Sequence, residues 1–226
     1  MAKVYKVGTR SSPLALKQVE EVLNALRQFY PAIRVQVVCL DTYGDRDKRI
    51  PISDIEGSDF FTREIDEALL RGEIDFGVHS AKDLPDSLRK GLIMAAITKG
   101  LEPHDVLISK RGLRLNELPR GAKIGTSSRR RKEGLKGFRP DLNVVDIRGN
   151  IGERLTKLDS SDMDGIVTAG CALFRLGLES RITQIILFEI IEPHPLQGAL
   201  AIVARKEDTN LIKVLSILDS RGKVSI

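Results

Sequence analysis

The chain has 226 residues, of which 42% are hydrophobic and 30% charged, so it can bury one large core or two smaller ones and is not a disordered chain. No apolar run approaches the roughly 20 residues that span a bilayer. The N-terminal MAKVYKVGTRSS lacks the apolar core of a secretory signal. We therefore expect a soluble protein of the cytoplasm.

Residues that bind structural metals are sparse. The two cysteines, Cys39 and Cys171, belong to no CxxC pair, and the three histidines (His79, His104 and His194) are far apart in the sequence. We expect no metal site. Both cysteines are expected to be reduced and partly buried at strands or strand ends.

The basic residues are unevenly placed. The net charge is only +5, yet nine arginines lie between residues 111 and 154. Such a segment can bind nucleic acid or an anionic small molecule. Aromatic residues make up only 4% of the chain and tryptophan is absent, which counts against stacking on single-stranded bases. The nine arginines are Arg111, Arg114, Arg120, Arg129, Arg130, Arg131, Arg139, Arg148 and Arg154.

The first hundred residues alternate expected strands with expected helices. Ser12 and Pro13 are typical of an N-cap and a first helical position. The following helix would place Val19, Val22, Leu23, Leu26 and Phe29 on one face. The polar segment 41–55 is expected to be a mobile surface loop. A second helix is expected at 61–70, with Phe61, Ile65 and Leu69 on one face, and strands are expected at 3–9, 33–40, 74–78 and 92–98.

A second series of strands and helices follows Glu102 and Pro103. Ser127 or Ser128 is expected to cap one helix, and Asn150 to cap another that runs to Leu158. The remaining expected helices are 171–176 and 210–218, and the expected strands are 123–126, 143–147, 165–169 and 200–205.

This alternation predicts an α/β fold with two lobes, whose mostly parallel sheets are flanked by helices. The chain would leave the first lobe near residues 100–103 and return near 193–197. The expected domains are residues 1–99 plus 197–226, and residues 103–193. A ligand is expected in a cleft between the lobes, at the carboxyl ends of the strands.

Three segments combine a strand end, a helix start and basic residues. GTRSSP (8–13) offers backbone N–H groups beside Arg10, although a capped helix with a solvated arginine would look the same. GTSSRRR (125–131) offers hydroxyls and three arginines. Since successive helical residues lie about 100° apart, we expect two of these arginines to face the ligand and one to face solvent. DIRGN (146–150), with Arg148 and then Arg154, supplies two more guanidinium groups, which bind carboxylates bidentately.

An acidic residue stands among these basic segments. HSAKDLP (79–85) follows an expected buried strand, and strand ends are where α/β active sites form. Asp83 can stabilise a developing cation or transfer a proton. His79 is the rival acid–base candidate, with the alternative that it is a hydrogen-bonded structural histidine.

Five motifs resemble the hydroxymethylbilane synthase (porphobilinogen deaminase) family in order and spacing, over about residues 3–218. They are GTRSSPLAL, FFTREIDEALLRGEIDFGVHSAKDLP, IGTSSRRR, VDIRGNIGERLTKL and LQGALAIVAR. The resemblance implies lobes like those of type II periplasmic-binding-protein-like domains. It implies a transferase that joins four porphobilinogen molecules head to tail, with loss of ammonia, to give linear hydroxymethylbilane for tetrapyrrole biosynthesis. A dipyrromethane cofactor, held by a thioether to a cysteine, primes the chain.

The resemblance also assigns residues. The catalytic aspartate falls on Asp83. Substrate-binding positions fall on Arg10, Ser12, Arg148, Arg154 and Arg175. Cofactor-binding positions fall on Ser80, Lys82, Thr126, Ser128, Arg130, Arg131 and Gln197.

The sequence departs from the family in two places. A glycine-lysine lid sequence is replaced by EGSD (56–59). The third domain, which carries the cofactor cysteine, is absent from the expected organisation, so the site of attachment is unknown. Cys171 at a helix start is a substitute candidate, beside the plainer interpretation of a small residue packed at a strand end.

Three functions remain as hypotheses. The first is the enzyme, alone or as a subunit that needs a separate third-domain polypeptide. The second is a two-lobe binding module for an anionic small molecule, which would gain nothing from a negative charge at Asp83. The third is nucleic-acid binding through Arg129, Arg130 and Arg131. We expect porphobilinogen and the growing polypyrrole chain as ligands, and no nucleic acid or membrane as partner.

Overall fold

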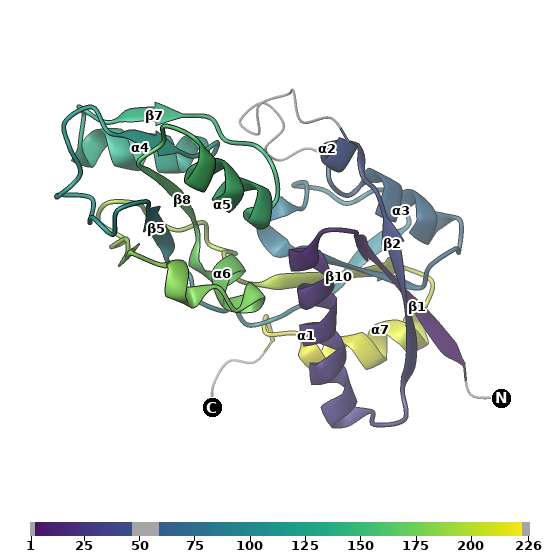
Figure 1. The fold of residues 1–226 in the computed structure, drawn as a ribbon. Coiled ribbons are helices and arrows are strands. Elements are labelled where there is room, and N and C mark those ends of the chain that lie inside the picture. Colours follow the sequence, from purple (N-terminus) through teal and green to yellow (C-terminus); the bar gives the residue numbers. More distant parts are fainter. Residues whose placement is uncertain (1–2, 47–58, 223–226) are drawn as a thin grey trace. The chain divides into compact units, whose positions relative to one another are not determined.

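The computed structural model describes residues 3–46 and 59–222, which form two compact units (Figure 1). Unit 1 contains residues 3–46, 59–100 and 198–222, and unit 2 contains residues 101–197. Within the described ranges, no helix is both long enough and apolar enough to cross a membrane.

Unit 1 is built on a five-stranded sheet in the order β2-β1-β3-β10-β4. Strand β1 is parallel to both of its neighbours, β2 and β3, whereas β10 is antiparallel to both β3 and β4. One strand therefore runs against the other four. The strands are β1 (Val4–Arg10), β2 (Arg34–Leu40), β3 (Phe76–Ser80), β4 (Leu92–Ile97) and β10 (Leu200–Arg205).

Helix α1 (Pro13–Phe29) begins where the sequence predicts. The Ser12 hydroxyl accepts a hydrogen bond from the Ala15 N–H at 3.3 Å, and Pro13 occupies the first turn, where its missing N–H costs nothing. Its apolar face packs on β1, β3 and β10 together with α7 (Thr209–Leu215). Each fully buried leucine or valine there contributes about 1.5–3 kcal/mol.

Helix α3 (Arg63–Leu70) covers the opposite face of the same sheet. Val7 and Phe76 pack in the core beneath α1, so their neighbours Gly8 and Gly77 point to the other side. A Cβ on Gly77 would lie 2.9 Å from the Cγ2 atom of Ile65, and one on Gly8 would collide with Ile74. Gly77 therefore lets α3 approach β3 closely, and Gly8 leaves room for the Ile74 side chain.

Short helical segments complete unit 1. They are α2 (Tyr43–Arg46), the 3₁₀ turn η2 (Ala81–Asp83) and the 3₁₀ turn η4 (Ser216–Leu218).

Unit 2 repeats the arrangement with the order β7-β6-β8-β5-β9. Strands β7, β6 and β8 are parallel, and β5 is antiparallel to both β8 and β9. The strands are β5 (Asp105–Ser109), β6 (Lys123–Gly125), β7 (Asn143–Val145), β8 (Gly165–Ala169) and β9 (Gln184–Ile185), and the helices are α4 (Arg129–Phe138), α5 (Ile151–Ser160), α6 (Gly170–Leu176) and the 3₁₀ turn η3 (Glu179–Arg181).

The helices of unit 2 are fixed by different means. Helix α5 begins with a capping box: the Asn150 side chain accepts from the Glu153 N–H at 2.9 Å, and the Glu153 carboxylate accepts from the Asn150 N–H at 3.1 Å. Helix α4 buries only Arg131 and Leu135. It is held close to the segment around Ile190, whose carbonyl oxygen a Cβ on Gly134 would strike.

Several sequence predictions need correction. The sheets are mostly parallel, as predicted, but one strand of the five in each is reversed (β10 and β5), and strand β5 was not predicted. Helix α3 begins at Arg63, so Phe61 precedes it. Phe29 is 52% exposed because it lies at the last turn of α1, beyond the sheet. Cys39 is exposed on the edge strand β2, whereas Cys171 is buried. Residues 43–46 of the predicted loop are helical, and residues 47–55 lie outside the described ranges.

Asp66 on α3 provides a test of the packing in unit 1. Its carboxyl group is fully buried, and burial raises its pKa to about 6. The unfolded chain binds this proton less tightly, so the free energy of unfolding should fall as the pH rises through the window from about 4 to about 6. The free energy of unfolding of Asp66→Asn, relative to that of wild type, should therefore rise by about 1–2 kcal/mol as the pH is raised from about 5 to about 8. Urea unfolding curves measure this difference, and a constant difference would contradict it.

Candidate functional site

A small pocket of about 60 Å³ lies in unit 1 at the carboxyl ends of β1 and β3. The start of α1 and the residues before α3 complete its wall. The polar side chains that line it are those of Thr9, Arg10, Ser12, Gln18, Thr62, His79, Ser80 and Asp83. Four residues that the sequence nominated for binding or catalysis, Arg10, Ser12, Ser80 and Asp83, are thus brought together within one unit.

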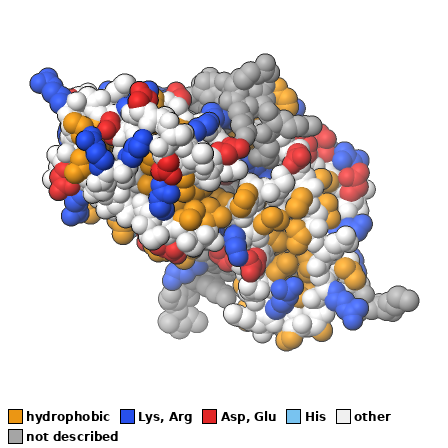
Figure 2. Space-filling model, in the orientation of Figure 1, with side chains coloured by type: hydrophobic (Ala, Val, Ile, Leu, Met, Phe, Trp, Pro, Cys, Tyr) orange, Lys and Arg blue, Asp and Glu red, His pale blue; other side chains and the backbone are white. Residues whose placement is uncertain are grey.

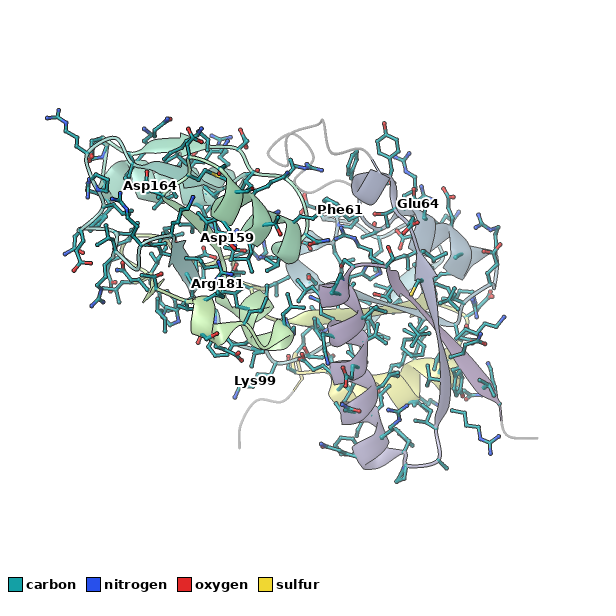
Figure 3. The ribbon with its side chains drawn as sticks, viewed as in Figure 1. Phe61, Glu64, Lys99, Asp159, Asp164 and Arg181 are labelled. Atoms are coloured by element: carbon teal, nitrogen blue, oxygen red, sulfur yellow. The ribbon has the colours of Figure 1, made fainter. Side chains whose placement is uncertain are left out.

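Arg10 is the last residue of β1. Its guanidinium carbon lies 4.5 Å from the centre of the Phe61 ring, which is labelled in Figure 3. This cation–π contact restrains the side chain without neutralising its charge. Arg10 is therefore held at the pocket wall by the Phe61 ring.

Gln18 was missed by the sequence analysis. Its amide Nε2 donates a hydrogen bond to the Ser80 hydroxyl at 2.8 Å, although Gln18 lies on the buried face of α1. The hydroxyl hydrogen of Ser80 thereby remains available for a ligand. Gln18 lies three residues after Ala15 and four before Val22, so it falls on the apolar face of α1. A polar residue on that face was the signal that could have identified it.

Asp83 is the last residue of η2, directly after β3. The turn is tied to the sheet because the Ala81 N–H donates to the carbonyl oxygen of Ala199 at 3.0 Å. Asp83 is partly exposed on the pocket wall, and within the described ranges its carboxylate has no hydrogen-bond or ion-pair partner. Lys82, its neighbour, is also partly exposed. The pocket thus contains an accessible carboxylate beside an arginine.

His79 lines this pocket and is buried. Burial, together with the positive charge of Arg10, lowers the pKa of its imidazole to about 4. Its Nε2 atom has no hydrogen-bond partner among the described residues. A neutral imidazole carries no extra proton to donate near neutral pH, which disfavours His79 as a general acid.

The second group of nominated residues lies in unit 2, at the start of α4. Arg129 is exposed and pairs with Glu133 one turn later, whereas Arg130 and Arg131 both bind the buried carboxylate of Asp105. Two of the three arginines therefore point together and one faces solvent. Asp105 was not nominated from the sequence.

The loops before α4 and α5 are joined by a buried hydroxyl. Ser127 Oγ donates to the carbonyl oxygen of Ile147 at 2.8 Å and accepts from its N–H at 3.0 Å. Ser128 occupies the N-cap position of α4 but its side chain makes no capping hydrogen bond. Thr126 is fully buried, and its hydroxyl has no partner in the described part of the chain.

The remaining nominated residues of unit 2 are on neighbouring elements. Arg148 and Arg154 flank the start of α5, and the Arg154 Nε donates to the carbonyl oxygen of Gly149 at 2.8 Å. Arg175 lies in the last turn of α6 and is partly exposed. Gln197 is buried, and its amide donates to the carbonyl oxygen of Pro103 and to Asp105.

Much of the arginine-rich segment is neutralised within unit 2. Arg111 pairs with Asp164, and Arg139 pairs with Asp141 while also donating to the carbonyl oxygens of Leu115 and Leu118. Basic and acidic side chains are interspersed on the face of unit 2 that Figure 2 shows. This pattern disfavours a broad basic surface for nucleic acid.

The two cysteines differ in accessibility. Cys171 is only 5% exposed in α6, which disfavours it as an anchor, whereas Cys39 is exposed on the edge strand β2. In residues 3–46 and 59–222, no three potential ligand residues come together in a way that could hold a metal ion. The lid segment nominated at 56–59 lies outside the described ranges except for Asp59, which pairs with Arg63 and Arg89.

The lowered pKa of His79 predicts a pH dependence of stability. The unfolded chain binds a proton near pH 6.5 and the folded chain only near pH 4, so stability is present above this window and lost as the pH falls through it. Replacing His79 with Gln should remove this loss. The stability difference between wild type and variant should change by about 2 kcal/mol between about pH 8 and pH 5, in favour of the variant at the lower pH. Urea unfolding at several pH values measures this difference. If the stabilities of wild type and variant changed equally with pH, the pKa of His79 would not be lowered by folding.

Solved structures resemble the chain in fold. The methionine-binding protein MetQ matches with a TM-score of 0.57 and 15% identity over 95% of this chain and 89% of that one. The VFT2 domain of Bordetella pertussis BvgS matches with a TM-score of 0.52 and 14% identity over 94% and 85% of the two chains. The fold is therefore α/β of the type II periplasmic-binding-protein-like class, as predicted.

Sequence relatives are much closer. Residues 5–213 match the family model described as porphobilinogen deaminase, dipyromethane cofactor binding domain. The porphobilinogen deaminase of Pelotomaculum thermopropionicum is 42% identical over 98% of this chain and 71% of its own length. That of Natranaerobius thermophilus is 43% identical over 95% of this chain and 69% of its own length. The chain therefore belongs to the porphobilinogen deaminase family.

Proposed function

We propose that this protein catalyses the reaction of its family, in which four porphobilinogen molecules condense head to tail with loss of four ammonia molecules, and one water molecule supplies the hydroxyl group of linear hydroxymethylbilane. The family match supports this over residues 5–213. The observation that carries the proposal is the carboxylate of Asp83, which has no partner among the described residues and lies on the wall of a pocket that also contains Arg10. A site that only bound carboxylates would be weakened by a negative charge there.

Asp83 is the proposed catalytic residue. When porphobilinogen loses ammonia, the pyrrole that remains carries positive charge, which a nearby carboxylate stabilises. The same carboxylate can deliver a proton to the leaving amine and later receive the proton released from the attacking pyrrole. Its place on η2, fixed to the sheet through Ala81 and Ala199, keeps it in position between these steps.

The basic residues bind the acetate and propionate groups of the pyrroles. Each porphobilinogen carries two carboxylates, so a growing chain needs several guanidinium groups. The proposed substrate-binding residues are Arg10, Ser12, Arg148, Arg154 and Arg175, and the proposed cofactor-binding residues are Ser80, Lys82, Thr126, Ser128, Arg130, Arg131 and Gln197.

The residues of unit 2 fit a polar, anionic cofactor. Thr126 Oγ1 and Arg131 Nε are buried and have no hydrogen-bond partner among the described residues. A dipyrromethane carries carboxylates and pyrrole N–H groups that could satisfy such atoms. When bound, it supplies the primer onto which substrate is added.

The cytoplasm is the proposed site of action, since neither cysteine forms a disulfide. Because the thiol of Cys171 is buried, a third-domain polypeptide that carries the cofactor cysteine is a further proposed partner.

A binding module for an anionic small molecule is the second candidate, because the fold is also that of the methionine-binding protein MetQ. It predicts that porphobilinogen binds without being consumed.

Substitution of Asp83 tests the catalytic proposal. Asp83→Asn keeps the shape of the side chain but can neither stabilise the cation nor transfer the proton. Formation of hydroxymethylbilane should fall by a factor on the order of 100 or more. The stability should change by less than about 0.5 kcal/mol, because the carboxylate has no partner in residues 3–46 and 59–222. Asp86→Asn, at an exposed site in the same loop, is the matched control. Full activity of Asp83→Asn would exclude this role.

The intact mass of the protein from cells tests the cofactor. A gain equal to two pyrrole units shows a covalent dipyrromethane, and peptide mapping identifies the cysteine. An unmodified protein that gains activity only with a purified third domain of a relative would support the partner polypeptide. Binding of porphobilinogen with no turnover in any of these preparations would favour the binding module.

A further inference from the structure

Asp105 is the most completely enclosed charged group in the arginine cluster of unit 2. Its side chain is 0% exposed. One carboxylate oxygen lies 2.8 Å from Nη2 of Arg130, and the other lies 2.8 Å from Nη2 of Arg131 and 3.0 Å from the amide of Gln197. A single carboxylate therefore holds two neighbouring guanidinium groups and is itself held by an amide.

The fold explains how an acidic residue reaches this place. Asp105 is the first residue of β5, the reversed strand, and it pairs with Ala169, the last residue of β8. Its side chain is thus at the carboxyl edge of the parallel strands, where α4 begins. The surrounding backbone is fixed as well, because the Ile186 N–H donates to the carbonyl oxygen of Asp105 at 2.9 Å and the Gly170 N–H to that of His104 at 2.9 Å.

Stability alone is a poor reason for this arrangement. Ion pairs in a protein interior lose hydration, and apolar residues of similar volume often serve the fold as well. A buried carboxylate between two arginines does provide orientation, because each guanidinium is directed by a short contact before any ligand arrives. Preorganised groups bind more tightly, since less freedom is lost on binding.

The arrangement also leaves charge for a ligand. Two guanidinium groups and one carboxylate carry a net charge of +1. The side chain of Arg130 remains 27% exposed and also donates to the carbonyl oxygen of Glu192. Arg131 is 8% exposed, and its Nε has no hydrogen-bond partner in the described part of unit 2. Each arginine therefore binds Asp105 through its Nη2 group and retains further N–H groups that can donate to a ligand.

We propose that Asp105 is a positioning residue that holds Arg130 and Arg131 in the orientation in which they bind ligand carboxylates. The proposal rests on the proposed function only for the identity of the ligand. Asp105 acts through the two arginines and does not itself contact the reacting atoms.

The sign of the effect separates positioning from simple electrostatics. Asp105→Asn removes a negative charge, so if Asp105 only offset the arginine charge, anions would bind more tightly. If Asp105 positions the arginines, the Kd for inorganic sulfate at the Arg130–Arg131 pair should rise by about tenfold or more. Asp141→Asn is the matched control, because it removes the carboxylate paired with Arg139 elsewhere in unit 2. It makes the same change in net charge and should leave this Kd within about twofold.

A double-mutant cycle shows whether Asp105 acts through Arg130. In an Arg130→Ala background, Asp105→Asn should raise the Kd for sulfate by much less than it does in the wild type. Equal effects in both backgrounds, or a lowered Kd in Asp105→Asn, would overturn the proposal. If Asp105→Asn does not fold, Asp105→Glu replaces it in the same cycle, since it keeps the charge and displaces it by one methylene.

A measurement without turnover keeps this proposal separate from the proposed function. The Nε–H NMR signals of Arg130 and Arg131 can be followed during titration with inorganic sulfate. Wild type should show sulfate-dependent shifts that weaken in Asp105→Asn and persist in Asp141→Asn. If wild type makes no hydroxymethylbilane but shows this pattern, the function is wrong and the role of Asp105 stands. Unchanged sulfate shifts in Asp105→Asn would exclude that role.

Discussion

Each sheet contains one strand that runs against the other four, β10 in unit 1 and β5 in unit 2. In a purely parallel sheet, the first residue of every strand lies at the edge opposite the functional one. A reversed strand instead begins at the carboxyl edge. Leu200 pairs with Ser80, the last residue of β3, and Asp105 pairs with Ala169, the last residue of β8. The turn that carries Asp83 in unit 1 and the contacts of Asp105 with two arginines in unit 2 both depend on this reversal.

The two reversed strands have different consequences for two aspartates. In unit 1, the carbonyl oxygen of Ala199, directly before β10, accepts a hydrogen bond from the Ala81 N–H and so fixes the turn that carries Asp83. In unit 2, the first side chain of β5 is itself the acid, and it is saturated by Arg130, Arg131 and Gln197. One carboxylate therefore remains partly exposed on a pocket wall, while the other holds two guanidinium groups. Residue type alone does not distinguish these roles.

Local signals made part of this structure predictable. The starts of α1 and α5 follow from Ser12 with Pro13 and from Asn150 with Glu153, because capping involves residues only a few positions apart. The split among the three adjacent arginines follows from the helical repeat. Strand β5 could not be found in this way. Its pairing partners β8 and β9 lie roughly sixty to eighty residues away along the chain, and its direction depends on them rather than on its own sequence.

The arginine-rich segment shows what composition leaves out. An arginine attracts an anion to the extent that its charge has not been neutralised by the protein. Arg111, Arg129 and Arg139 each face a carboxylate of their own, so they add little to an anion site. Arg130 and Arg131 share one carboxylate, so the pair retains positive charge and gains a fixed geometry. A polyanion such as nucleic acid needs many solvent-facing charges along a surface. A few oriented, partly neutralised guanidinium groups better suit a small ligand with carboxylates at defined positions.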